Sequence, residues 1–367
     1  MRECANHFLA GEILPVIKLE AMEPYEMGLA IGKRFSAMIE RRLEQDPLVR
    51  SQLVPFSRTS DGEQLVDDLS ATNRNAFPRY WDELRGIADG SGASFLELLL
   101  LNLRKEIFPF LPTEVAKARD VNLEAVECSD ILVCRPDLTV VAHNEDADVS
   151  VEGHAFLLHA VLPHGVSFFA YTYAGELPTC AFGFNSFGVA FTLDAVPLAP
   201  SETVRGGVGR NFVSRDLLEA KDFTDALKRI QNPTLSAGHC YNLLDINAKM
   251  IFNVETASKQ RFTSLQISEA PYFHANMYLC LDVSQVSNDS SLHRQKRAAE
   301  MPKNSLEEIL AVLGDGSDEL YPIYMTGPKL CTLVTVVFDA SSRTMTLYHG
   351  NPAKSSTLQL EISLDSV

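Results

Sequence analysis

A cysteine and an aspartate lie at equal distances from a turn near the middle of the chain. The turn segment, Arg135-Pro136-Asp137, separates two short apolar runs, 129–134 and 139–144, so an antiparallel hairpin centred on Asp137 is predicted. Cys128 and Asp146 are each nine residues from that centre. Residues equidistant from a hairpin turn face each other with Cβ atoms about 5 Å apart, although a slip of one residue would separate their faces. We therefore expect a thiol and a carboxylate to meet at the open end of the hairpin.

A carboxylate beside a cysteine raises the pKa of the thiol, so a working thiolate needs a cation between the two. Cleavage of the bond between Glu127 and Cys128 would supply one, because it frees the α-amine of Cys128. Such an amine has an ordinary pKa of about 7.7–8.0, which suits a general base at neutral pH. The amine would take the thiol proton and Asp146 would orient the resulting ammonium. This pattern is typical of an N-terminal nucleophile.

The elements that position these residues change in character near residue 125. Before that point the spacing of apolar residues predicts helices that begin at Pro24, cover 80–88, and follow Ser94 to about residue 107. After it, alternating apolar runs predict hairpins, interrupted by helices. The predicted strand pairs are 129–134 with 139–144, 156–162 with 166–173, 182–184 with 188–193, 240–246 with 250–255, and 332–339 with 344–348; the helices are 211–220, 223–230 and 305–313. This order predicts the α+β class, with helices layered outside antiparallel sheets.

Five short motifs in this order resemble one known family. They are Glu127-Cys128-Ser129-Asp130, His143-Asn144-Glu145-Asp146, Tyr173-Ala174-Gly175-Glu176-Leu177-Pro178, Gly183-Phe184-Asn185-Ser186-Phe187-Gly188 and His274-Ala275-Asn276. Together they resemble the N-terminal-nucleophile (Ntn) hydrolases of the isopenicillin-N acyltransferase family. The third motif and Asn351-Pro352 are similar to the insect N-β-alanyl-dopamine hydrolases of that group. The resemblance is strongest between residues 128 and 195.

The resemblance implies a four-layer αββα sandwich made by a precursor that cuts itself before the nucleophile. Residues 1–127 would then form a helical N-terminal segment, the pro-segment or α subunit, packed on the core. Residues 128–367 would form the catalytic core, or β subunit. The two processed fragments are expected to stay together as a heterodimer.

The same resemblance implies the roles of three residues. Cys128 would be the nucleophile and the new N-terminus, and Asp146 would hold its α-amine. Asn276 would donate its side-chain amide to the oxyanion, an interaction typically worth about 2.7–4 kcal/mol in the transition state. The chain departs from the family at two places: Glu127 stands where relatives usually have glycine, and 321–327 lacks the arginine often found there.

The function implied is hydrolysis of the amide bond of a small N-acyl amine, such as a β-alanyl amide, through an acyl-thioester. An acyltransferase with acyl-CoA as co-substrate, or an uncleaved binding protein without catalytic activity, are alternatives. A cysteine peptidase with His274 as the base is a third. No other cofactor is expected. His143, Glu145 and Asp148 match no metal-ligand spacing, and the glycine-rich 205–210 segment follows no strand of a βαβ unit, so we expect a loop near the site.

Composition excludes several classes of protein. The 367 residues carry a formal net charge of −16, which argues against nucleic-acid and anionic-membrane partners. The longest strongly apolar stretch, 95–103, is far shorter than the roughly 20 residues of a membrane span. Seven scattered cysteines are typical of reduced thiols, and the N-terminus shows no secretory signal, so we expect a cytoplasmic location.

Overall fold

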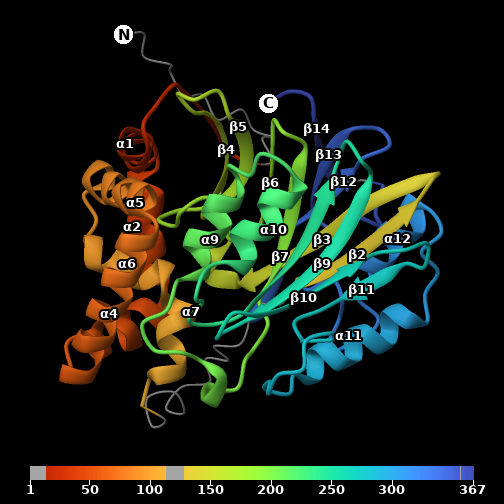
Figure 1. Cartoon of the computed structure of the whole chain (residues 1–367). Coiled ribbons are helices and arrows are strands. Elements are labelled where there is room, and N and C mark those ends of the chain that lie inside the picture. Colours follow the sequence, from red (N-terminus) through yellow and green to blue (C-terminus); the bar gives the residue numbers. More distant parts are fainter. Residues whose placement is uncertain (1–13, 113–127, 356) are drawn as a thin grey trace.

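Two stacked β-sheets form the centre of the molecule, and helices cover both outer faces (Figure 1). The computed structural model describes residues 14–112, 128–355 and 357–367. The larger sheet has the order β1-β4-β5-β6-β7-β8-β9-β10. Its strands are β1 (Val16–Glu20), β4 (Ala155–Val161), β5 (Ser167–Tyr173), β6 (Phe182–Asn185), β7 (Val189–Asp194), β8 (His239–Asp245), β9 (Met250–Ala257) and β10 (Arg261–Gln266).

The smaller sheet carries the hairpin that the sequence singled out. Its order is β11-β2-β3-β12-β13-β14. Its strands are β11 (Tyr272–His274), β2 (Cys128–Arg135), β3 (Leu138–Asp148), β12 (Leu330–Asp339), β13 (Thr344–His349) and β14 (Leu358–Ser363). Within the described residues these strands pair antiparallel, apart from β1, which pairs parallel with β4.

Helices from the N-terminal third and from residues 210–231 pack on the larger sheet, and two later helices pack on the smaller one. The first group comprises α1 (Pro24–Arg34), α2 (Ser36–Gln45), α3 (Val54–Ser57), α4 (Ser60–Ala76), α5 (Pro78–Ser91), α6 (Phe95–Asn102), α7 (Arg104–Ile107), α9 (Arg210–Leu217) and α10 (Phe223–Gln231). The second comprises α11 (Asp289–Ala299) and α12 (Leu306–Leu313).

Alternation along β2 and β3 shows how the layers are made. Ile131 and Val133 pack with the α11 and α12 layer, whereas Leu132 between them packs against the larger sheet. Val141 on β3 likewise joins the inter-sheet core, while its neighbours join the outer one. Because side chains of a strand point alternately to its two faces, one hairpin closes two cores. The result is an αββα sandwich, as the family resemblance implied.

The predicted hairpins and helices are present, but several elements were missed. These are β1, α4, α11, β10, β11 and β14. Strand β1 has only five residues, yet it aligns with β4 from Val16–Leu157 to Glu20–Val161. A residue range that reads as helical therefore also contributes an edge strand to the larger sheet.

Helices α1 and α5 pack unusually closely because glycines line their contact. A Cβ on Gly28 would lie 2.0 Å from the Glu83 carbonyl oxygen, and one on Gly86 would lie 2.2 Å from the Tyr25 carbonyl oxygen. Gly32 and Gly90 repeat the arrangement one turn further along. Any side chain at these positions would force the two backbones apart, so the contact requires glycine.

The helices in the described ranges are all too short or too polar to cross a lipid bilayer. Within the same ranges every cysteine is a free thiol, as the scattered cysteine pattern predicted.

Candidate active site

The pairing of β2 with β3 places Cys128 opposite Glu145 and not opposite Asp146. The predicted register is therefore wrong by one residue. The loop consists of Pro136 and Asp137 alone, so the hairpin is centred between them and not on Asp137. Two-residue connections are the commonest in hairpins, which is the physical reason for the difference.

This shift puts the predicted pair on different faces of the sheet. Cys128 and Glu145 share the face that looks toward the larger sheet, whereas Asp146 belongs to the face that looks toward α12. Its strand neighbour Asn144 donates from Nδ2 to the Leu313 carbonyl oxygen, 2.8 Å away at the end of that helix. Asp146 is fully buried and accepts a hydrogen bond of 2.5 Å from the Thr332 hydroxyl. It thus lies in the wall behind the nucleophile and not across from its side chain.

A buried histidine connects two carboxylates on the face that carries Cys128. His143 Nδ1 lies 2.8 Å from Asp130 Oδ2, and its Nε2 lies 2.9 Å from Glu145 Oε2. Burial alone would lower the pKa of His143, but the two carboxylates outweigh it and raise that pKa well above its ordinary value. The imidazole therefore carries a positive charge, which compensates part of the buried negative charge.

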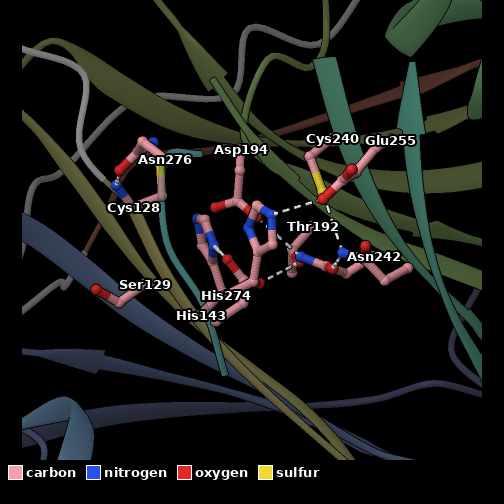
Figure 2. Close-up of polar contacts among 12 residues, drawn as sticks. Cys128, Ser129, His143, Thr192, Asp194, Cys240, Asn242, Glu255, His274 and Asn276 are labelled. Carbon is pink, nitrogen blue, oxygen red and sulfur yellow. Dashed lines mark hydrogen bonds and ion pairs between the residues drawn. The ribbon is translucent and has the colours of Figure 1, made fainter. Parts of the chain in front are cut away.

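The network continues toward the larger sheet through Thr192, Asn242 and Asp194 (Figure 2). Asp130 accepts from the Thr192 hydroxyl, and Asn242 Nδ2 donates to both Thr192 Oγ1 and Asp194 Oδ2, each over 3.1 Å. Burial and the adjacent Asp130 charge raise the pKa of Asp194 to about 7. On the far side of Asp194, His274 Nδ1 lies 3.0 Å from its Oδ2. Charged and polar groups thus form a continuous buried chain between the two sheets.

The thiol of Cys128 lies at the end of this chain. Its Sγ, a ring nitrogen of His143 and a carboxylate oxygen of Glu145 are all within 4.8 Å of one another. Burial raises the pKa of the thiol well above its usual value, and nearby carboxylates, Glu145 foremost, raise it further. In the uncut chain the sulfur is therefore a neutral thiol, and activation requires additional positive charge.

The backbone of Cys128 is held by two side chains from outside the hairpin. Its N–H donates to Asn276 Oδ1 over 2.7 Å. Arg294 of α11, which is fully buried, donates to that same oxygen over 2.9 Å and to the Cys128 carbonyl oxygen. Asn276 Nδ2 in turn donates to the Ala195 carbonyl oxygen over 2.9 Å. Asn276 therefore presents its oxygen to Cys128, whereas the family resemblance implied that its amide nitrogen serves the reacting carbonyl.

A pocket of about 750 Å³, counting the solvent at its mouth, opens beside Asn276. Its walls come from both sides of residue 127. Lys105 precedes the proposed cleavage point, while Ala195 and Arg210 follow it. The remaining lining residues are Phe108, Pro109, Val196, Pro197, Leu198, Pro200, Thr203, Ala237, Gly238, Val286 and Asn288. The glycine-rich segment expected to lie near the site indeed ends at this pocket, because Arg210 follows its last glycine.

Sequence reasoning missed Glu145, Arg294 and the network members Asp130 and Asp194. The signal for Glu145 was present, since His143 and Glu145 alternate on one strand, but the register error turned both away from the thiol. The sequence around Arg294 did not predict helix α11, so no local signal marked Arg294 as a residue of the site. His274, considered as a peptidase base, groups with Asp194 and Cys240, and the histidine near Sγ is His143.

The same side chains form three overlapping groups with metal-binding donors. They are Cys128, His143 and Glu145; Asp130, His143 and Asp194; and Asp194, Cys240 and His274. In the first two groups both ring nitrogens of His143 are within hydrogen-bond distance of carboxylates, Asp130 for one and Glu145 for the other. These atoms are therefore already engaged with one another. Asp148, considered with them from the sequence, accepts the Ser150 N–H at the start of a short turn.

Comparisons with known proteins agree with the motifs. The model of the family described as acyl-coenzyme A:6-aminopenicillanic acid acyl-transferase matches residues 133–354. The beta-alanyl-dopamine/carcinine hydrolase of Drosophila melanogaster is 26% identical over 360 residues, covering 90% of this chain and 91% of that protein. The acyl-coenzyme A:6-aminopenicillanic-acid-acyltransferase 40 kDa form of Emericella nidulans is 24% identical over 302 residues, covering 79% and 80%.

Two solved structures are similar at lower identity. A Caenorhabditis elegans N-acylethanolamine-hydrolyzing acid amidase ortholog has a TM-score of 0.40 and 10% identity, covering 63% of this chain and 95% of that one. Penicillin V acylase from Agrobacterium tumefaciens has a TM-score of 0.38 and 11% identity, covering 65% and 87%. The fold assignment therefore rests on the layers described above. Because the family model spans more than half of its length, the chain belongs to the acyl-coenzyme A:6-aminopenicillanic acid acyl-transferase family, the isopenicillin-N acyltransferases that its motifs indicated.

Proposed function

We propose that this protein hydrolyses the amide bond of a small N-acyl amine with Cys128 as an N-terminal nucleophile. The observation that carries the proposal is the 2.7 Å hydrogen bond from the Cys128 N–H to Asn276 Oδ1, at the edge of a pocket. After cleavage the Cys128 nitrogen would be an amine, and Asn276 Oδ1 would already be in position to hold it. The family relatives, a hydrolase and an acyltransferase by name, act on such bonds.

Maturation would begin with attack of the Cys128 thiol on the carbonyl carbon of Glu127. The C–N bond between the two residues breaks, the acyl group moves to sulfur, and water hydrolyses the thioester to free the Glu127 carboxylate. The Cys128 nitrogen takes up a proton and becomes the α-amine. Glu127 lies outside the described residues, but Arg294 and Asn276 fix the Cys128 side of the bond.

The new amine would supply the positive charge that the Cys128 thiol needs in order to ionise. Before cleavage, burial and Glu145 hold the pKa of the thiol high. After cleavage, the amine takes the thiol proton, and the resulting ammonium and the His143 imidazolium both stabilise the thiolate. We assign the anchoring of this ammonium to Asn276 Oδ1 in place of Asp146, because the register places Asp146 on the other face.

Catalysis would then follow two steps. The thiolate adds to the amide carbonyl, and the ammonium gives its proton to the leaving amine as the C–N bond breaks. Water then hydrolyses the acyl-thioester, with the free amine as the base that removes its proton. Asn276 becomes an oxyanion donor only if its Nδ2 leaves the Ala195 carbonyl, so that predicted role requires a rotation of the side chain.

An acyltransferase is the second candidate, because the family model carries that activity in its name. The two reactions share the thioester and differ in whether water or an amine reaches it. In both, the cut chain would work as a heterodimer, since Lys105 from the first fragment lines the pocket with residues of the second. The cytoplasmic location inferred from the sequence stays a prediction.

The first experiment is the denatured mass of freshly purified protein beside Cys128→Ala. Cleavage before Cys128 gives fragments of about 14 and 27 kDa from a chain of 40.6 kDa. The Cys128→Ala variant should remain whole, and Cys240→Ala, which removes another buried thiol, should cut normally. A single 40.6 kDa species from the unmodified protein would exclude the N-terminal amine and this mechanism with it.

A further inference from the structure

The pocket beside Asn276 contains two cationic side chains that nothing in the described structure neutralises directly. Arg210 is only 6% exposed and Lys105 is half-buried. Within the described residues, neither side chain has a hydrogen bond or an ion pair. Buried cations are normally paired, so an unpaired arginine in a pocket indicates a missing anion.

Glu106 is the carboxylate that acts most strongly on these cations, ahead of Glu176, and both carboxylates are already engaged. Glu106 accepts the backbone N–H of Arg210 over 3.0 Å and exerts its charge on that residue from behind the pocket. Glu106 itself is not among the lining residues. The charged side chains among the lining residues are the cations Arg210 and Lys105, so the pocket surface is positive at neutral pH whenever Lys105 is protonated.

The neutral lining of the pocket suits a short ligand with one polar end. The Thr203 hydroxyl is buried and lacks a hydrogen-bond partner within the described ranges. The apolar walls consist of Phe108 and Pro109 on the N-terminal side and of Val196 and Leu198 on the other. A chain of a few carbon atoms that ends in a carboxylate would cover the apolar walls and place its oxygens at the cations and the hydroxyl.

We propose that the amide substrate carries a carboxylate, separated by a short apolar spacer from the scissile bond, and that Arg210 and Lys105 bind it. This inference rests on the proposed hydrolase function and specifies its substrate class. Arginine matches carboxylate geometry with paired donors, which favours it over lysine as the main contact. A β-alanyl group would bring an ammonium into the same pocket and is therefore a poor occupant.

The overall charge of −16 does not reverse this preference. Charges further away than a Debye length, about 8 Å at physiological ionic strength, are largely screened, whereas Arg210 and Lys105 would contact the ligand directly. The arginine missing from residues 321–327 fits the same interpretation. A carboxylate bound by Arg210 and Lys105 needs no arginine in that segment.

The test compares matched amides that differ by one carboxylate. Glutaryl- and butyryl-p-nitroanilide vary the acyl side, and the butyryl amides of 4-aminobenzoate and of aniline vary the amine side. In one of the two pairs we expect the amide with the carboxylate to be the better substrate. Arg210→Met and Lys105→Met should each lower kcat/KM for that amide by about 10- to 100-fold, mainly by raising KM. The uncharged partner should change by less than about 3-fold. Arg58→Met and Lys33→Met make the same changes at exposed positions and should leave all rates unchanged.

A binding measurement separates failure of this inference from failure of the proposed function. Glutarate titrated calorimetrically into the purified protein should bind, and Arg210→Met should remove that binding. Glutarate binding without hydrolysis of any amide would sink the hydrolase proposal and keep the anion pocket. If β-alanyl-p-nitroanilide were the preferred substrate and Arg210→Met did not change its hydrolysis, the anion pocket would be rejected and the hydrolase proposal kept. If Arg210→Met lowered the rate with a CoA thioester but with none of the amides, the carboxylate assignment would be overturned. Arg210 would then be assigned to the phosphates of CoA.

Discussion

The inter-sheet network that ends at Cys128 and the pocket that Asn276 lines differ in the sign of their charge and in how that charge is satisfied. The inter-sheet network is rich in carboxylates, fully buried, and closed by hydrogen bonds such as those of His143. The pocket is cationic, open to solvent, and leaves Arg210 without a partner in the described residues. The difference teaches that Asp130 and Glu145, the carboxylates beside the nucleophile, are satisfied within the protein by His143. Groups that recognise a substrate are left for the ligand to satisfy.

The comparison predicts very different losses of stability on the two sides. His143→Leu leaves Asp130 and Glu145 as buried carboxylates without a cation, which should lower the free energy of unfolding by about 3–5 kcal/mol. Arg210→Met removes a side chain without a direct partner and should cost less than about 1 kcal/mol. Urea denaturation of both variants measures this. Equal losses would show that the pocket cation is structural.

Asn276, at the junction of the two regions, should have the next largest effect. Asn276→Leu keeps the size of the side chain but removes the acceptor that holds both the Cys128 N–H and Arg294. We expect processing and amide hydrolysis to slow by about 100-fold or more, comparable to the loss of an active-site hydrogen-bonding group. Asn185→Leu, which removes another buried asparagine that hydrogen-bonds to backbone groups of residues 187, 189, 218 and 220, is the matched control. Normal processing of Asn276→Leu would contradict the anchoring role.

The network should also control the reactivity of the thiol. The charge of Glu145 raises the pKa of Cys128, so Glu145→Gln should lower that pKa and let iodoacetamide modify Cys128 at lower pH. Mass analysis of the peptide that begins at Cys128 follows the reaction. Asp146→Asn, one residue further on the other face, should shift the profile less. A larger shift from Asp146→Asn would favour the register that the sequence predicted.

The smallest effect concerns the pH dependence of ligand binding in the pocket. Burial, Arg210 and Arg104 lower the pKa of Lys105 to about 7, while Cys128 and Glu106 oppose that shift. Lys105 is therefore charged below about pH 7 and loses its charge above it, so glutarate affinity should fall several-fold between pH 6 and 8. Lys105→Met should flatten this dependence while Lys33→Met keeps it. A profile that persists in Lys105→Met would assign the titration to another group, such as Glu106.

The layers of the fold followed from local patterns, whereas the site depended on a single register. Alternation along β2 and β3 and the turn at Pro136 are short-range signals, and they predicted the hairpin correctly. Whether Cys128 faces Glu145 or Asp146 depends on one residue of loop length, and composition does not resolve that. Family resemblance identified the cysteine but could not orient its neighbours.

Contacts across long sequence distances were the other limit. Arg294 reaches Cys128 from a helix more than 160 residues later, and Lys105 reaches the same site from the N-terminal third. No spacing rule connects such residues, because their proximity follows from how the two sheets and their helices stack. The pocket, and with it the sign of its charge, therefore became visible only in the folded chain.

Strand β1 has a consequence for how a cut enzyme would age. Five residues of the N-terminal fragment form the edge strand β1 and pair with β4, and the glycine contact of α1 with α5 holds the adjoining helices together. Release of that fragment would require the sheet edge and its apolar core to open together. Dilution should thus separate the two pieces no faster than the whole protein unfolds, and the lifetime of the enzyme would equal its unfolding time at any concentration.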